Sequence, residues 1–116
     1  MANPHNASQI FEDVLSTVIT QNSSDLHISV GRHPTMRIDG ALMPILQHDI
    51  ITPDMATAFV FTILNEEQRE RFMREKEIDL SYNFRDRARF RVNAFFQRGF
   101  IGAALRLIPT KIRTFE

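Results

Sequence analysis

Apolar residues recur every three or four positions near the start of the chain, and at every second position further on. The helical spacing predicts an amphipathic helix over residues 8–21, with Asn6 and Ser8 as cap candidates. Its inner face would carry Ile10, Phe11, Val14, Leu15, Val18 and Ile19. DLHISV at 25–30 then alternates apolar and polar residues, which predicts a half-buried strand.

The next segment, TMRIDGALMPIL at 35–46, predicts a hairpin. Its two short strands are joined by Asp39-Gly40, a dipeptide that readily supplies the positive φ angles of a tight turn. We expect these two strands and the 25–30 strand to form one antiparallel group.

Two consecutive helices follow the hairpin. Thr52-Pro53 pairs a cap residue with a proline at the first helical position, and apolar residues continue at helical spacing as far as Leu64. Asn65 and Gln68 resemble a capping box that starts a second, highly charged helix over 65–77.

Alternating patterns return in the last third of the chain. EIDLSYNF at 77–84 and ARFRVNAFFQ at 88–97 predict strands, and FIGAALRLIP at 100–109 closes the regular structure. The order of the elements predicts an α+β fold, with an antiparallel sheet flanked by helices.

Composition limits the possible functions. The chain has 116 residues, of which 43% are hydrophobic and 24% charged, as expected for one compact domain. Fourteen basic residues balance fourteen acidic ones, so an electrostatic function has to be local. The absence of cysteine excludes disulfides and thiolate metal sites. No apolar run approaches the length of a membrane span.

The arginines of the C-terminal part are the main candidates for chemistry. Residues 85–109 hold six arginines and one acidic residue. If 88–97 is a strand, Arg89 and Arg91 lie on the polar face, opposite the apolar face formed by Phe90, Val92, Ala94 and Phe96. A two-residue turn at Arg98-Gly99 would pair positions whose numbers sum to 197. Arg91 would then stand directly opposite Arg106.

This register depends on the turn. Arginine tolerates a positive φ angle poorly, and a longer loop that used Gly102 would shift the pairing. Two guanidinium groups side by side cost stability unless a negative group lies near them. The alternative is that these arginines are solvated and that their stems cover apolar neighbours.

Other chemistry-bearing residues are sparse. Asp25 and His27 share a strand face near His33, which suggests either a metal site or, as we favour, a hydrogen-bonded polar pair. We assign no metal ligand and no catalytic residue, because no serine lies beside a base and no carboxylates are paired. The four glycines, at 31, 40, 99 and 102, cannot form a phosphate-binding P-loop. We therefore expect no enzymatic activity from this chain alone.

Three segments, in this order and spacing, carry a family resemblance: SSDLHISVGRHPTMRIDGALMPI at 23–45, ILNEEQRERF at 63–72, and RFRVNAFFQRGFIGAALRLIPTKIRTFE at 89–116. Together they resemble the N-terminal domain of the type IV pilus twitching-motility ATPases, the PilT-like retraction motors of the secretion ATPase superfamily. The resemblance implies a PAS-like domain over 1–110, with 111–116 beginning the linker to a RecA-like catalytic domain.

The family also implies roles for particular arginines. In related motors, the arginines that match Arg91 and Arg106 contact the phosphates of nucleotide bound to the catalytic domain. Arg89 and Arg98 are auxiliary candidates on the same basic face, for which the family offers no clear match. ATP and Mg²⁺ would belong to the full-length motor and not to this chain.

The resemblance to these motors also implies the partners of the domain. They are the RecA-like domain of the same or a neighbouring subunit, a homo-hexamer and, indirectly, the inner-membrane platform of the pilus. The expected location is the cytoplasm, at the inner membrane through the pilus machinery, with no membrane insertion and no contact with nucleic acid.

Two other functions remain open. RFRVNAFF at 89–96 loosely resembles a strand that binds RNA, with Phe95 among basic residues, although the expected glycines are missing. The chain could instead be a free-standing PAS-like sensor that binds a small ligand or dimerises.

Overall fold

The computed structural model describes residues 4–109, which form a six-stranded antiparallel sheet with three helices. The strand order across the sheet is β3-β2-β1-β6-β5-β4. The strands are β1 Asp25–Ile28, β2 Thr35–Ile38, β3 Ala41–Pro44, β4 Glu77–Phe84, β5 Ala88–Gln97 and β6 Phe100–Ile108. The predicted α+β fold with an antiparallel sheet is confirmed. The three N-terminal strands are neighbours, and β1 also pairs with β6.

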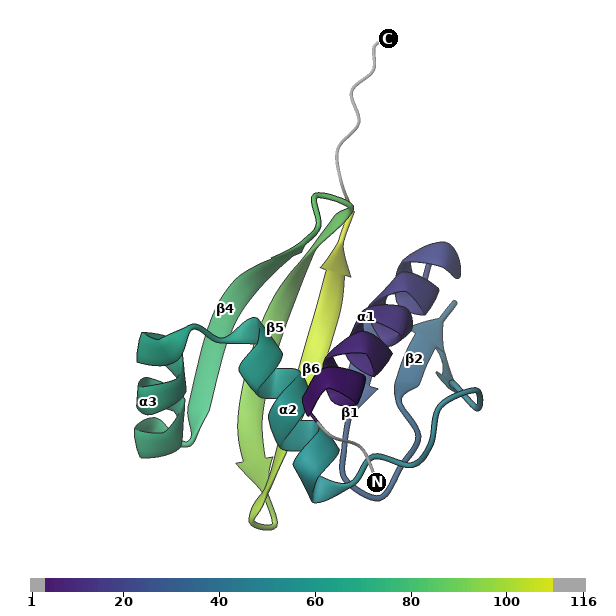
Figure 1. Cartoon of the computed structure of the whole chain (residues 1–116). Helices are drawn as coiled ribbons and strands as arrows, with labels where there is room; N and C mark the ends of the chain where they lie inside the picture. Colours follow the sequence, from purple (N-terminus) through teal and green to yellow (C-terminus); the bar gives the residue numbers. More distant parts are fainter. Residues whose placement is uncertain (1–3, 110–116) are drawn as a thin grey trace, which may run out of the picture.

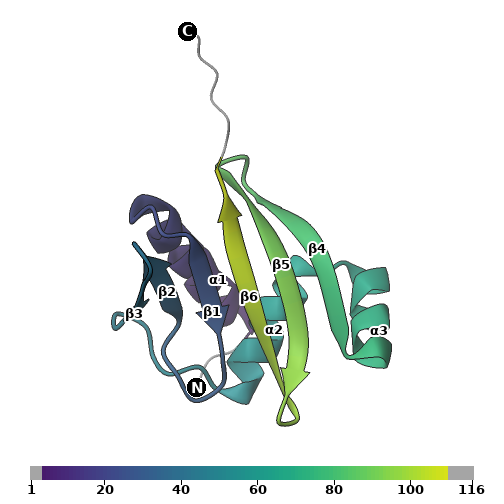
Figure 2. The same cartoon turned by 180° about the vertical axis from the view of Figure 1, so that it is seen from behind.

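The helices cover the sheet unevenly. Helices α1 (Pro4–Thr20) and α2 (Pro53–Ile63) pack on one face, and α3 (Glu66–Glu75) lies beside the β4 edge (Figure 1). The opposite face of the sheet is free of helices (Figure 2). We call it the open face. Any polar group that alternation places on the open face is therefore available to a partner.

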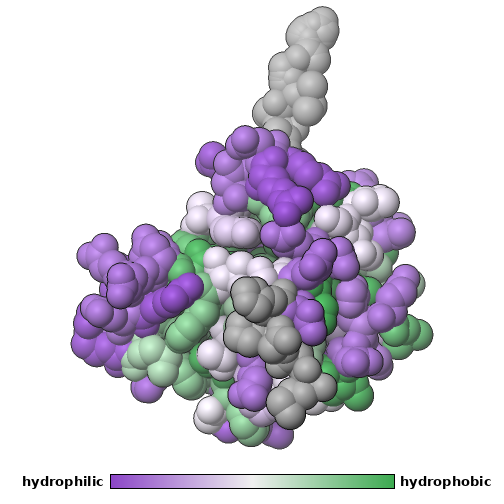
Figure 3. Space-filling view, in the orientation of Figure 1, coloured by the Kyte–Doolittle hydropathy of each residue, from purple (hydrophilic) through white to green (hydrophobic). Residues whose placement is uncertain are grey.

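The core lies between the sheet and helices α1 and α2. Phe11 of α1 and Phe59 of α2 are fully buried and stack with their ring centroids 5.1 Å apart. Apolar residues of β1, β5 and β6 complete this layer, among them Leu26, Ile28, Phe90, Val92 and Leu105. The outer surface of α3 is hydrophilic, as is the surface of the turn between β4 and β5 (Figure 3). No helix within residues 4–109 is long and apolar enough to span a membrane.

Helix α3 begins at the predicted capping box. The Asn65 side chain accepts a hydrogen bond from the Gln68 backbone N–H at 2.8 Å, and the Gln68 side chain accepts from the Asn65 N–H at 2.9 Å. Helix α2 begins at Thr52 and Pro53, also as predicted. The Arg69 side chain of α3 donates hydrogen bonds to the backbone carbonyls of Phe61 and Leu64, and so links α3 to the end of α2.

Asn65→Ala is expected to lower the free energy of unfolding by about 1 kcal/mol, because it leaves the Gln68 backbone N–H at the start of α3 without its partner. Urea denaturation measures the change. Glu70→Ala, at an exposed position in the middle of α3, is the matched control and should shift stability by less than about 0.5 kcal/mol. Equal effects of the two substitutions would contradict the role of the cap.

The two tight turns fix the register of their hairpins. Asp39 and Gly40 have φ angles of 51° and 84°, and Arg98 and Gly99 have 55° and 82°. The second turn has two residues, so positions that sum to 197 are paired, and Arg91 stands opposite Arg106. Both predictions of turn and register are confirmed. Arg98 adopts the left-handed conformation that made this register uncertain from sequence alone.

Some boundaries differ from the sequence predictions. The first helix begins at Pro4 rather than residue 8, so Asn6 and Ser8 lie inside it and neither caps it. Proline fits the first turn of a helix because its missing N–H has no partner there in any case. Strand β1 ends at Ile28, two residues before the predicted end, because the chain turns at Ser29 to Arg32. The predicted linker at 111–116 lies outside the described residues.

Candidate functional site

A row of charged residues crosses the open face of the sheet. Directly paired positions on four neighbouring strands place Arg37 of β2, Asp25 of β1, Arg106 of β6 and Arg91 of β5 side by side. We call these four residues the charged row. Three of them are cations and one is an anion, so the row carries a local excess of positive charge in a chain that is neutral as a whole.

Asp25 is the anion that lies between two of these arginines. Its carboxylate accepts a hydrogen bond from Arg106 Nε at 3.1 Å, and Arg37 Nε lies 3.7 Å from its other oxygen. The Ser24 hydroxyl also donates to it, at 2.8 Å. The Asp25 side chain is only 15% exposed, whereas that of Arg106 is 74% exposed. Asp25 therefore orients the Arg106 side chain and leaves much of its guanidinium open to a partner.

The pKa of Asp25 follows from this setting. Burial by itself raises the pKa of the carboxyl, but the hydrogen bonds from Ser24 and Arg106 and the positive charge of Arg106 outweigh it. The pKa of Asp25 therefore lies below its ordinary value. Asp25 is ionised at neutral pH and holds its two arginine partners.

Asp25→Asn is expected to destabilise the domain at pH 7, because the amide cannot form these ion pairs. A lowered pKa in the folded state contributes stability that is full above the unfolded value of about 3.9 and is lost as pH falls through the folded value. The gap between the two proteins in urea denaturation should therefore persist from pH 7 to 5 and close below about pH 4. A gap of constant size down to pH 2.5 would contradict the ion-pair role.

Arg91 differs from Arg106 in having no compensating charge. Within residues 4–109 its side chain forms neither a hydrogen bond nor an ion pair, and its cross-strand neighbours are Arg106 and Ser81. The like-charge pair foreseen from the sequence is thus only partly neutralised, through Asp25 on the far side of Arg106. Arg89 points to the same face two residues earlier on β5, opposite Ile108.

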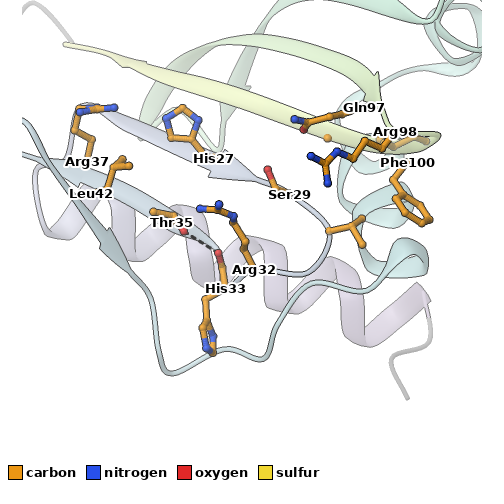
Figure 4. A pocket seen from close by; sticks show the side chains of 13 residues that line it. His27, Ser29, Arg32, His33, Thr35, Arg37, Leu42, Gln97, Arg98 and Phe100 are labelled. Atoms are coloured by element: carbon orange, nitrogen blue, oxygen red, sulfur yellow. Dashed lines mark hydrogen bonds between the residues drawn. The ribbon is translucent and has the colours of Figure 1, made fainter.

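Arg98 lies elsewhere. It sits in the β5–β6 turn, seven positions after Arg91 and about 20 Å from that residue along β5. Arg98 lines a pocket of about 470 Å³ at the opposite end of the open face, together with His27, Ser29 and Arg32 (Figure 4). The structure therefore brings together Arg91, Arg106 and Arg89, and places Arg98 in a pocket that Arg37 of the charged row also lines.

The remaining candidates have structural partners. His33 Nδ1 lies 2.7 Å from the carbonyl oxygen of His48, and the carboxylate of Asp25 is occupied by arginines. Among the described residues, no group of three or more histidine and acidic side chains could hold a metal ion. Phe95 is half-buried, and its ring packs over Gly102 on the neighbouring strand. This contact occupies part of the aromatic surface that an RNA-binding strand would offer.

The sequence predicted part of the open face, but it did not predict the contacts that Asp25 makes there. Alternation in 25–30 placed Asp25 outward, but nothing in the sequence paired it with Arg106, 81 residues away. A useful signal would have been its position. Asp25 is an acidic residue at an outward strand position, in a fold whose other outward strands are rich in arginine.

Sequence and structure comparisons agree on the relatives of this chain. It is 36% identical over 106 residues to the type IV pilus ATPase PilU of Pseudomonas aeruginosa, and 38% identical over 108 residues to the retraction ATPase PilT of the same organism. A crystal structure of the pilus retraction motor PilT with bound ADP matches with a TM-score of 0.81 and 29% identity, over 88% of this chain. Over nearly its whole length, the chain matches the N-terminal region of PilT- and PilU-like type IV pilus ATPases.

The match covers nearly all of this chain but only part of the relatives. The alignment with PilU covers 91% of this chain and 28% of PilU, and the alignment with PilT covers 90% of this chain and 30% of PilT. The aligned part of the solved PilT structure is likewise 30% of that chain. No protein-family model matches the domain. The predicted resemblance to the secretion ATPase superfamily is confirmed.

Proposed function

We propose that this domain is the non-catalytic module of a type IV pilus retraction ATPase, and that its open face meets a RecA-like catalytic domain. Arg91 and Arg106 contact the phosphates of the nucleotide held by that domain. The module also helps to assemble a homo-hexamer, in which the catalytic domain belongs to the same or a neighbouring subunit. The motor acts in the cytoplasm on the inner-membrane platform of the pilus.

One observation carries this proposal: Arg91 and Arg106 are paired across two strands of the open face, and Arg91 has no counter-charge within residues 4–109. Such a pair is stabilised by an anion that bridges both guanidinium groups. Guanidinium groups offer fixed, parallel donors that match phosphate oxygens. The PilT structure with bound ADP supports a nucleotide as the source of that phosphate.

Binding of the nucleotide itself depends on the catalytic domain. The four glycines of this chain cannot form a P-loop, and the described residues contain no cluster of acidic and histidine side chains for Mg²⁺. The role of this domain is thus to add positive charge to phosphates that another domain holds. In phosphoryl transfer such arginines stabilise the charge that develops on the transferred group.

Calorimetric titration of this domain into the separately expressed catalytic domain of its motor tests the proposal. We expect association that is stronger with a non-hydrolysable ATP analogue than without nucleotide, and that is weakened at least tenfold by Arg91→Ala together with Arg106→Ala. Arg89→Ala, on the same face and strand, is the matched control and should change affinity less than threefold. Association that is insensitive to nucleotide and to the double substitution would overturn the phosphate role.

A further inference from the structure

The pocket around Arg98 is a second candidate site, which meets the charged row at Arg37. Its floor is the end of β1 and the start of β6, and its sides are the loop after β1 and the β5–β6 turn (Figure 4). Its lining includes three arginines, Arg32, Arg37 and Arg98, and no acidic residue. A pocket of about 470 Å³ has the size of an ordinary small-molecule site.

Two of the three arginines are uncompensated. Arg37 is engaged, because it donates to the Gly40 carbonyl at 2.9 Å and lies near Asp25. Within the described part of the chain, the side chains of Arg32 and Arg98 form no hydrogen bond and no ion pair. Figure 4 shows both pointing toward the middle of the pocket, with the Ser29 hydroxyl between them. Two cations and a hydroxyl thus converge on one space.

Hydrogen bonds fix the backbone at both arginines in the absence of a ligand. The loop that carries Arg32 is fastened to Ile51 by two hydrogen bonds, from Gly31 N to Ile51 O and from Ile51 N to Arg32 O, each of 2.9 Å. Arg98 is held in a two-residue turn of a long hairpin. The backbone at each arginine is thus fixed, and only the side chain has to be ordered when a ligand binds.

The backbone conformation of Arg98 is uncommon for its residue type. Its φ angle of 55° is unfavourable for a residue with a side chain, and asparagine is the residue that such turns prefer at this position. Lys76 and Arg85 adopt the same left-handed conformation elsewhere in the chain.

The rim of the pocket is apolar on one side. Phe100 follows the turn and is 46% exposed, and Leu42 on β3 is 53% exposed. An exposed aromatic ring beside two free guanidinium groups suits a ligand with an anionic end and a flat or apolar body.

We infer that this pocket binds a small phosphate ester of the nucleoside phosphate class, with its phosphates on Arg32, Arg98 and Ser29 and its body against Phe100. Arg98 is about 20 Å from Arg91 along β5, so a single phosphate group cannot reach both residues.

Calorimetry on the 116-residue chain with ADP, pyrophosphate and a hexaglutamate peptide as probes tests the inference. We expect ADP and pyrophosphate to bind, and Arg32→Ala and Arg98→Asn each to weaken both by about tenfold. Phe100→Ala should weaken ADP and leave pyrophosphate unchanged. Arg89→Ala should leave both affinities unchanged.

Arg98→Asn also separates binding from folding. It places Asn-Gly in the turn, so the melting temperature should rise by about 3 °C while the ligand affinity falls. Absence of ADP and pyrophosphate binding at millimolar concentration would overturn the inference. Equal losses in the Arg89→Ala control, or tighter binding of the hexaglutamate peptide than of ADP, would overturn it as well. Loss of ADP binding only in the Arg91 and Arg106 double variant would assign the nucleotide to the charged row.

Discussion

Replacing Arg91 and Arg106 with alanine in an ATPase that carries this domain together with its catalytic domain lowers kcat by about 100-fold. Arginines that stabilise the transferred phosphoryl group contribute factors of about 10³ to 10⁵ in related chemistry. We expect a smaller loss here because the catalytic domain supplies the other phosphate contacts. Steady-state hydrolysis measured at saturating ATP separates this effect on kcat from an effect on KM.

The folding of these variants should be nearly unaffected. Arg91 has a like-charged neighbour and no counter-ion among residues 4–109, so its removal relieves repulsion. Arg106→Ala removes one exposed ion pair with Asp25, worth at most about 1 kcal/mol. Arg106→Lys keeps the charge but loses the fork of parallel donors, so it should recover only part of the rate. A double variant with an unchanged kcat would remove the assignment.

Phe59→Ala should be the most destabilising single substitution in the core, by about 4 kcal/mol. Phe59 is 0% exposed and stacks on Phe11, so its ring joins α2 to α1 beneath the sheet. Its removal leaves a cavity between elements that neither helix can close alone. Urea denaturation followed by circular dichroism gives the free energy of unfolding.

Two further variants keep this prediction testable if Phe59→Ala does not fold. Phe59→Leu retains most of the volume and should lose about 1 to 2 kcal/mol. Phe100→Ala removes a ring that is 46% exposed, and should lose less than about 1 kcal/mol. A loss below 1 kcal/mol for Phe59→Ala would contradict the position of the core.

The structure follows the sequence most closely where local chemistry decides the geometry. Strands β4 and β5 have the predicted bounds, because alternation with one buried face leaves no freedom of register. A two-residue turn at Arg98-Gly99 was one of two turns that the sequence allowed, and that turn fixes the pairing of Arg91 with Arg106. The cross-strand arginine pair could thus be predicted from the sequence.

The contacts of Asp25 could not be predicted from the sequence. The pairing of β1 with β6 joins segments about 80 residues apart, and its register is set by packing in the core rather than by a turn. Without that register, the sequence could not show that an acidic residue compensates Arg106. Likewise, Arg32 and Arg98 are 66 positions apart, and only the completed sheet places them in one pocket.

The central claim concerns where Arg91 and Arg106 lie when nucleotide is bound. The most direct measurement is the structure of the intact motor with a non-hydrolysable ATP analogue. We predict both guanidinium groups within hydrogen-bond distance, about 2.7 to 3.2 Å, of phosphate oxygens. Guanidinium groups that instead face solvent, or pair with protein carboxylates away from the nucleotide, would contradict the account.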